Sequence, residues 1–442
     1  MRTLFLLILA PLIALPEAHG AADLLSIYRD AQNADAVYAS ARAAYDAGKE
    51  VLPQGRAGLL PSVSLSGNTQ INDRDLTFRG AAGLSVSQRY NTNNVTIVGT
   101  QPLFNYQSWI TYQRAKDQVS QAEAQFLQTG QDLIVRVAQA YFDVLLAEFN
   151  VTLAAAQKEA IGEQLAQAKR NFEVGSATIT DANDAQARYD LTVSQEIAAQ
   201  NDLEVKKQAL EQIIAKRAPE LAKIGPNFSL APPAPNNMDQ WVEQAMNSSF
   251  QVKIAQANLD IAAKSVEFSR AGHLPTVNAI ASYTDQGSGA GVQGGPGFDS
   301  STTFMGLQLA VPIFQGGLVN SQVRQAVANI EKARQDLENA KRTAAFNTKQ
   351  SFLGVTNGMA QAKALQAALV SSQSSLDSSK LGQEVGVRTQ VDVLNAQQQL
   401  ISARRDYAQT LYNYVLSALR LKAAAGTLTE EDLAYINAGL VQ

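Results

Sequence analysis

Residues 63–71 read VSLSGNTQI. In this stretch the mainly apolar set Val63, Leu65, Gly67, Thr69 and Ile71 alternates with the polar residues at positions 64, 66, 68 and 70. A period of two places successive side chains on opposite faces of a β-strand, and about ten residues of such alternation are typical of a strand in an outer-membrane barrel. Three further segments have the same extended character: 95–103, 277–283 and 305–313. In the last of these an apolar set shares one face, namely Met305, Leu307, Leu309, Val311 and Ile313.

The four predicted strands form two pairs, each joined by a polar loop. The predicted loops are Asn72–Asn91 and Asp285–Ser301, and the second is rich in glycine, as exposed loop tips of membrane barrels often are. Aromatic residues lie at or just past the strand ends, where an interfacial belt is expected: Tyr106, Trp109 and Phe314. A soluble β-sandwich is the alternative, but it needs many short strands in close succession, whereas long helical tracts separate these four.

The chain repeats itself after about 210 residues. Three landmarks recur with offsets of 214, 210 and 211 positions: AGLLP (57–61) as AGHLP (271–275), QPLF (101–104) as VPIF (311–314), and FEVG (172–175) as QEVG (383–386). Such a constant spacing indicates a tandem duplication. We therefore predict a first repeat over 23–230, a Pro-rich linker over 231–237, a second repeat over 238–425 and a tail over 426–442.

Each predicted repeat begins with a helical segment, Leu24–Val51 or Met238–Arg270, and ends with a long helical tract. The tracts lack proline from Asn105 to Ala218 and from Gln315 to the end, which allows helices of about 60 residues, or roughly 90 Å. Small and apolar residues recur there at heptad spacing: Ala115, Val119, Ala122, Phe126, Thr129 and Leu133, then Ala326, Ile330, Ala333, Leu337, Ala340 and Ala344. A simple coiled-coil rod would explain these seams, but it would not explain the strands.

Four strands cannot close a barrel, because the smallest membrane barrels have about eight. The exposed strand edges therefore require other copies of the chain. Two, three or four copies would supply about 8, 12 or 16 strands, and the helices would continue the barrel as an α-helical tube.

The first 22 residues predict a cleaved Sec leader. Arg2 precedes the apolar run Leu4–Leu15, Pro16 follows it, and small residues around 18–22 allow cleavage after Gly20 or Ala22. A membrane anchor is the alternative, but a run of about a dozen residues is shorter than the ~20 that a spanning helix needs. No later stretch approaches that length, so a membrane-spanning form must be a closed barrel.

The composition excludes several classes of function. A net charge of −4 gives no basic surface for nucleic acid. The chain has no Cys, and only His19 and His273 carry imidazoles, so the sequence predicts no metal site, no cofactor and no nucleophilic dyad. Carboxylates such as Asp184 and Asp190 lie on polar helix faces, and no sequence feature indicates a cleft around them. We therefore do not expect an enzyme.

Over the whole mature length, the chain resembles the TolC-type outer-membrane channel proteins of Gram-negative bacteria. The resemblance depends on the order of short strings rather than on any one residue: GRAGLLP (55–61), AYFDVL (140–145), QKEAI (157–161), GHLPT (272–276), PIFQGG (312–317), SSQSSLD (371–377), VDVL (391–394) and GTL (426–428).

The resemblance implies a mixed α and β fold, mainly long helices, in which three copies form a twelve-stranded outer-membrane barrel continued by a periplasmic α-barrel. The implied function is passive, gated export through the channel of a tripartite efflux or type I secretion system. The implied partners are two further copies, a periplasmic adaptor, an inner-membrane pump and outer-membrane lipid. The segment 219–237 and the tail after Gly426 resemble the equatorial collar of the family.

The resemblance also implies gate residues at the end of the helices far from the membrane. The turns Val174-Gly175 and Val385-Gly386 resemble the periplasmic tip of the family. Arg388 matches an arginine that ties its helix to a Thr-Asp pair, here Thr180-Asp181, and a solvated surface charge is the alternative for Arg388. Asp392 matches one of two carboxylates at the constriction, and Asn395 replaces the other. Gln164 is kept, whereas Gln383 and Lys380 depart from the family pattern.

A structural or adhesive surface protein, with the coiled coils as a stalk, is the alternative function. The heptads alone favour it, and bilayer conductance by the purified protein separates the two. The sequence leaves the cargo open, because pump and adaptor select what the channel exports.

Overall fold

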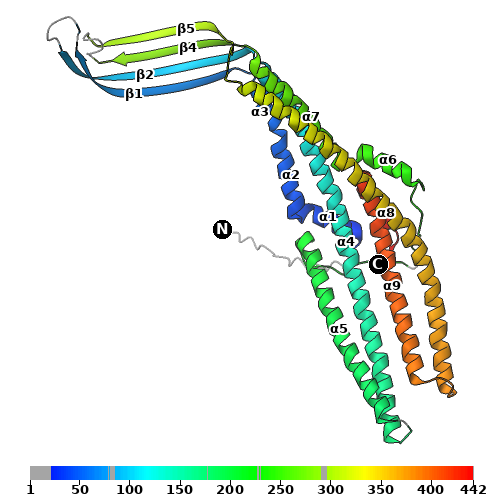
Figure 1. Cartoon of the computed structure of the whole chain (residues 1–442). Coiled ribbons are helices and arrows are strands. Elements are labelled where there is room, and N and C mark those ends of the chain that lie inside the picture. Colours follow the sequence, from blue (N-terminus) through cyan, green and yellow to red (C-terminus); the bar gives the residue numbers. More distant parts are fainter. Residues whose placement is uncertain are drawn as a thin grey trace, which may run out of the picture. The chain divides into compact units, whose positions relative to one another are not determined.

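The computed structural model describes residues 21–77, 79, 85–176, 178–225, 228, 230–289 and 296–441 (Figure 1). Residues 1–20 of the predicted leader, and Gly291, Gly294 and Gly295 of the predicted glycine-rich loop, lie outside these ranges. The described residues form two compact units, each of which takes segments from both predicted repeats. Unit 1 lies within 1–39, 129–242 and 347–442, and unit 2 lies within 40–128 and 243–346.

Unit 2 contains one antiparallel sheet of four strands, as the sequence predicts. The strands are β1 (Ser62–Thr77), β2 (Ser85–Phe104), β4 (Thr276–Ser288) and β5 (Phe298–Ala310), in the order β1-β2-β4-β5 (Figure 1). β2 pairs with β4, so the sheet joins the two sequence repeats at its centre and places β1 and β5 at its edges.

The predicted strand boundaries were wrong. Much of the predicted loops 72–91 and 285–301 is strand, with Asn72 opposite Tyr90 and Asp285 opposite Ser301. Polar side chains stabilise this extension by bonding across the strands: Asn72 Nδ2 donates to Thr92 Oγ1 at 3.1 Å. β5 ends at Ala310, so the prediction for Val311–Ile313 was also wrong; Pro312 lacks the N–H that would continue the ladder.

The predicted apolar strand face is exposed in the single chain. On the edge strands its side chains are 65–78% exposed: Val63, Leu65 and Ile71 on β1, and Met305, Leu307 and Leu309 on β5. Cross-strand pairing continues the face, since Leu65 lies opposite Ile97 of β2. An exposed apolar row of this extent requires an apolar environment around the sheet.

The N-terminal helical segment of each repeat is broken in the structure. The first repeat has α1 (Leu24–Ala34), α2 (Ala36–Lys49) and α3 (Val51–Ala57), and the second has α6 (Met238–Ser248), α7 (Phe250–Arg270) and the short 3₁₀ turn η1 (Ala271–His273). A capping side chain marks the first break of each segment: Asp35 Oδ1 accepts from the N–H of Tyr38, and Ser249 Oγ accepts from the N–H of Val252. Asp35 and Ser249 lie 214 positions apart, one repeat offset.

The long helices are confirmed. α4 (Tyr106–Glu173) has 68 residues and α8 (Leu318–Glu384) has 67; they precede α5 (Ile179–Ile214) and α9 (Gln390–Ala424). The heptad seam of α8 packs inward, with Ala326, Ala333, Leu337, Ala340 and Ala344 each at most 9% exposed. Of the helices in the described ranges, none has the apolar stretch that a membrane-crossing helix requires.

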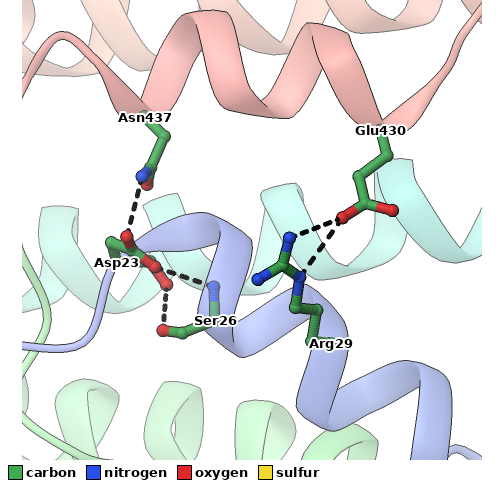
Figure 2. A network of polar contacts seen from close by, with 5 residues as sticks. All are labelled: Asp23, Ser26, Arg29, Glu430 and Asn437. Atoms are coloured by element: carbon green, nitrogen blue, oxygen red, sulfur yellow. Dashed lines mark hydrogen bonds and ion pairs between the residues drawn. The ribbon is translucent and has the colours of Figure 1, made fainter.

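In unit 1 the first and last helices of the described residues lie together. β3 (Lys223–Ile224) pairs with β6 (Leu440–Val441), and α1 packs against α5 and α10 (Glu430–Asn437). Figure 2 shows the polar contacts between α1 and α10, in which Asn437 donates to Asp23 and Arg29 donates to Glu430. The predicted tail is therefore a folded part of unit 1.

Candidate functional site

The two predicted tip turns join α4 to α5 and α8 to α9, both within unit 1. Their glycines have positive φ, 76° at Gly175 and 77° at Gly386, a conformation that side chains disfavour. The N–H of Ser176 donates to the carbonyl of Asn171, and the N–H of Val387 donates to the carbonyl of Gly382, each at 2.8 Å. This bond pattern ends a helix with a left-handed glycine. The two turns therefore have equivalent backbone geometry.

The helix that follows each turn begins with a capping box. In α9, the N–H of Thr389 donates to Asp392 Oδ2 at 2.9 Å, and the N–H of Asp392 donates to Thr389 Oγ1 at 3.2 Å. In α5, Thr178 and Asp181 make the same two bonds, at 2.9 and 3.3 Å. Both boxes satisfy backbone donors that a helix start leaves without partners. Asp181 and Asp392 are thus equivalent capping residues, 211 positions apart.

The capping bonds set the ionisation of both carboxylates. The backbone N–H and then the hydroxyl of Thr178 lower the pKa of Asp181, and those of Thr389 lower the pKa of Asp392. Arg388 adds a smaller lowering effect at Asp392, where its Nη1 lies 4.0 Å from Oδ1. Both aspartates therefore carry a negative charge at neutral pH.

Within one chain, Arg388 lies beside Asp392 rather than Asp181. Among the ion pairs of the described residues, the one that contains Arg388 is the pair with Asp392. The stem of Arg388 packs over Gly382, where an added Cβ would meet Cγ at 2.6 Å. Thr180 lies in the exposed first turn of α5, and Asn395 is exposed one turn beyond Asp392. A tie between Arg388 and Thr180-Asp181 stays a prediction.

Each helical hairpin has a small apolar core near its turn. Leu165, Ala168 and Ala185 pack α4 against α5, and Leu376, Val393, Ala396 and Leu400 pack α8 against α9. Leu165 and Leu376 are equivalent by the 211-residue offset, as are Ala185 and Ala396. The duplication thus extends to the packing of the hairpins.

Neutral side-chain amides link the two hairpins. Gln157 Nε2 on α4 donates to Gln398 Oε1 on α9 at 2.8 Å, and Gln164 Nε2 donates to Gln397 Oε1 at 3.5 Å. The sequence reasoning selected Gln164 and missed Gln157, Gln397 and Gln398. The heptad spacing of Gln157 and Gln164 was an available signal, because it places both on one face of α4.

The amide bonds are not the only contacts between α4 and α9. Each neutral hydrogen bond contributes about 0.5–1.5 kcal/mol. Phe142 also stacks on Tyr412, with ring centroids 5.4 Å apart, and Arg420 Nη2 donates to Gln139 Oε1 at 2.7 Å. In the parts of the chain that the structure describes, no group of three or more His, Asp or Glu side chains could hold a metal ion.

Comparisons of sequence place this chain among known proteins. The family model described as "Outer membrane efflux protein" matches residues 27–216 and 241–427. Outer membrane protein TolC of Vibrio cholerae serotype O1 is 32% identical over 440 residues, which cover 99% of this chain and 98% of that protein. The alkaline protease secretion protein AprF of Pseudomonas aeruginosa is 30% identical over 433 residues, which cover 97% of this chain and 90% of that protein.

The fold also matches a solved structure. The Campylobacter jejuni CmeC outer membrane channel superposes with a TM-score of 0.78 at 16% identity, over 95% of this chain and 90% of that chain. At this identity the likeness concerns the fold alone, and it agrees with a mixed α and β chain dominated by long helices.

Proposed function

The chain belongs to the outer membrane efflux protein family, and on that basis we propose that it is the gated export duct of a tripartite system. It is an outer-membrane channel that extends into the periplasm. One observation supports this proposal most directly. The chain combines a four-stranded sheet that has an exposed apolar face with two helices of 67 and 68 residues.

The family to which the chain belongs implies a trimer, and the edges of this sheet allow one. β1 and β5 lie at the sheet edges, and an edge strand leaves a row of backbone N–H and C=O groups for another strand to pair with. Pairing β5 of one copy with β1 of the next closes a barrel, and three copies supply about twelve strands, an even number within the range of membrane barrels. The exposed apolar side chains would then face lipid.

The gate of the duct is the end of the helices that carries the two glycine turns. Asp392 and Asn395 lie one turn apart at the start of α9, so a threefold axis near them brings three carboxylates together. Three such charges attract cations and would select for them. Arg388 holds the closed form by bonding to Thr180-Asp181 of another helix, and Gln164 adds an amide bond from α4 to α9.

The partners of the duct are a periplasmic adaptor and an inner-membrane pump. The family model is described as an efflux protein and one relative as an alkaline protease secretion protein, so both small molecules and proteins are candidate cargo. The exposed turn residues Val174 and Val385, 77% and 66% exposed, offer the adaptor an apolar contact.

Planar-bilayer conductance of the purified protein tests this function. We expect Asp392→Asn to weaken cation selectivity without loss of assembly, because asparagine still accepts the hydrogen bond from Thr389. Asp184→Asn is the control, since Asp184 is exposed on α5 and is assigned neither to the constriction nor to the lock. We expect Arg388→Ser to raise conductance, because a cost of about 1–3 kcal/mol at its upper end turns an open state of ~1% occupancy into a majority.

Two results would count against these assignments. Absence of any conductance from correctly folded protein would contradict the duct and favour a surface stalk. Equal effects of Asp392→Asn and Asp184→Asn on selectivity would contradict the constriction, since Asp392 is assigned to it and Asp184 is not.

A further inference from the structure

Unit 1 contains a cavity of about 260 Å³ between the Pro-rich linker, α9 and α10. Four aromatic side chains line it: Phe228, Trp241, Tyr414 and Tyr435. The rest of the wall is mainly aliphatic, and Ala418 lies on its α9 side. The proposed export path, the turns and the caps use none of these residues.

The aromatic walls are held in place by hydrogen bonds that point away from an occupant. Trp241 is 5% exposed, and its Nε1 donates to the carbonyl of Pro235 at 2.8 Å. Tyr414 is 6% exposed, and its hydroxyl both donates to the carbonyl of Ala231 at 2.6 Å and accepts from the N–H of Ala231 at 2.9 Å. The linker backbone therefore positions both rings before any ligand arrives.

The ionised groups of the cavity are also partnered. Lys422 Nζ donates to Asp432 Oδ1, and Asp432 Oδ2 accepts from the N–H of Thr429 at 3.0 Å. A charged ligand would have to compete with this ion pair. The walls thus favour an uncharged occupant.

We propose that this cavity binds a neutral, flat aromatic molecule of two or three fused rings. A water molecule needs two to four polar partners, which an apolar cavity with satisfied polar groups does not supply. Aromatic rings stack on, or meet edge-on, other rings with a gain beyond area burial. The volume lies just below the ~300–1,000 Å³ of sites for drug-sized ligands, which limits the occupant to a small ring system.

The binding site does not depend on the export function. Its walls belong to Phe228, the linker, α6, α8, α9 and α10, so an occupant joins segments that are far apart in the sequence. A molecule that binds the folded protein alone raises its stability by mass action. The ligand is therefore expected to stabilise this part of unit 1 whether or not the channel conducts.

Trp241 can report binding directly, because the chain has two tryptophans. In full-length Trp109→Phe protein, Trp241 is the remaining one, and the neutral probe 1-aminoanthracene absorbs where tryptophan emits. We expect the probe to quench Trp241 in a saturable manner and to raise the temperature of unfolding. Partition of the probe into detergent would instead give quenching that increases with probe concentration without saturating.

Filling the cavity from α9 tests the location. In the Trp109→Phe protein, Ala418→Phe should weaken probe binding by about tenfold or more, and Ala418→Val should weaken it less. Ala209→Phe is the matched control, because Ala209 is exposed on α5 outside the cavity. If Ala418→Phe fails to fold, the graded loss with Ala418→Val still decides the question. Quenching that does not saturate, or that Ala418→Val and Ala209→Phe leave equally unchanged, would overturn the proposal.

Discussion

Asn437 donates a hydrogen bond of 2.7 Å to Asp23, although the two residues are 414 positions apart. Asp23 is also the N-cap of α1, since its Oδ1 accepts from the N–H of Ser26 at 2.7 Å (Figure 2). Burial alone would raise the pKa of Asp23, but the bonds from Asn437 and Ser26 and the nearby charge of Arg29 hold that pKa below its ordinary value. The last helix of the chain thus completes the cap of the first.

Replacing Asn437 should loosen both ends of the chain. We expect Asn437→Ala to lower the free energy of unfolding by about 1–2 kcal/mol, because it removes a bond to a charged acceptor. Thermal unfolding followed by circular dichroism measures this change. Glu431→Gln is the control, since Glu431 is exposed on the same helix. An equal effect of the two variants would mean that the bond to Asp23 contributes nothing.

A second long-range pair predicts a pH dependence. Arg136 donates two bonds of 3.0 Å to Asp35, which is 4% exposed. These bonds are the main cause that lowers the pKa of Asp35, against the effect of burial. Because the folded pKa lies below the unfolded one, the pair stabilises the protein above about pH 4 and loses this effect as the pH falls further.

Arg136→Gln tests this pair at two pH values. At pH 7 we expect a loss of about 3 kcal/mol, because a buried carboxylate remains without its partner. The loss should shrink toward pH 3, where Asp35 of the variant is protonated. Arg29→Gln is the control, because Arg29 and Glu430 form an exposed pair, with side chains 63% and 44% exposed. A loss that is the same at both pH values would rule out Asp35 as the cause.

The architecture could be predicted from the sequence where the signal is periodic or repeated. The alternation in 63–71 predicted a strand, the heptads predicted the helices, and the landmark offsets predicted which elements of the two repeats correspond. The strand ends could not be predicted in this way, because the residues beyond Ile71 are polar and their composition is typical of a loop. They form a strand because they pair with residues 85–90 of β2.

The candidate site was harder to predict than the architecture. The bonds of Gln157 to Gln398 and of Gln164 to Gln397 join residues 241 and 233 positions apart, and no local period specifies such partners. The two capping boxes could have been recognised in the sequence from the pattern Thr-x-x-Asp, which occurs at 178–181 and 389–392. The resemblance drew attention to a lock and a constriction instead, so the structural role of Asp181 and Asp392 was missed.

Replacing Gly386 in the second glycine turn should lower stability through backbone strain alone, without a steric clash. Gly386 has φ of 77° and no heavy atom within 4 Å of an added Cβ. Gly386→Ala should therefore cost about 1–2 kcal/mol through the left-handed backbone alone. Gly386→Asn should cost less, because asparagine tolerates this region. Thermal unfolding compares the two, and equal losses would show that backbone strain is not the cause.

The amide bond between α4 and α9 predicts an asymmetry between its two partners. Gln157 is 9% exposed, whereas Gln398 is exposed. Gln398→Ala leaves the buried Gln157 amide unsatisfied and should cost about 1–3 kcal/mol. Gln157→Leu leaves the exposed Gln398 to water and should cost less than about 0.5 kcal/mol. Adding Gln157→Leu to Gln398→Ala should then recover most of the loss, since both polar partners are gone.

A double-mutant cycle on thermal stability measures this coupling. If α9 moves away from α4 when the duct opens, Gln398→Ala should also raise the open fraction in bilayers, because the bond is made only in the closed form. The double variant should close again as its stability recovers, since the closed form then contains no unsatisfied amide at this position. A parallel recovery of the closed fraction and of stability identifies a gate contact. A Gln398→Ala channel that is destabilised but opens like wild type would leave the bond as packing alone.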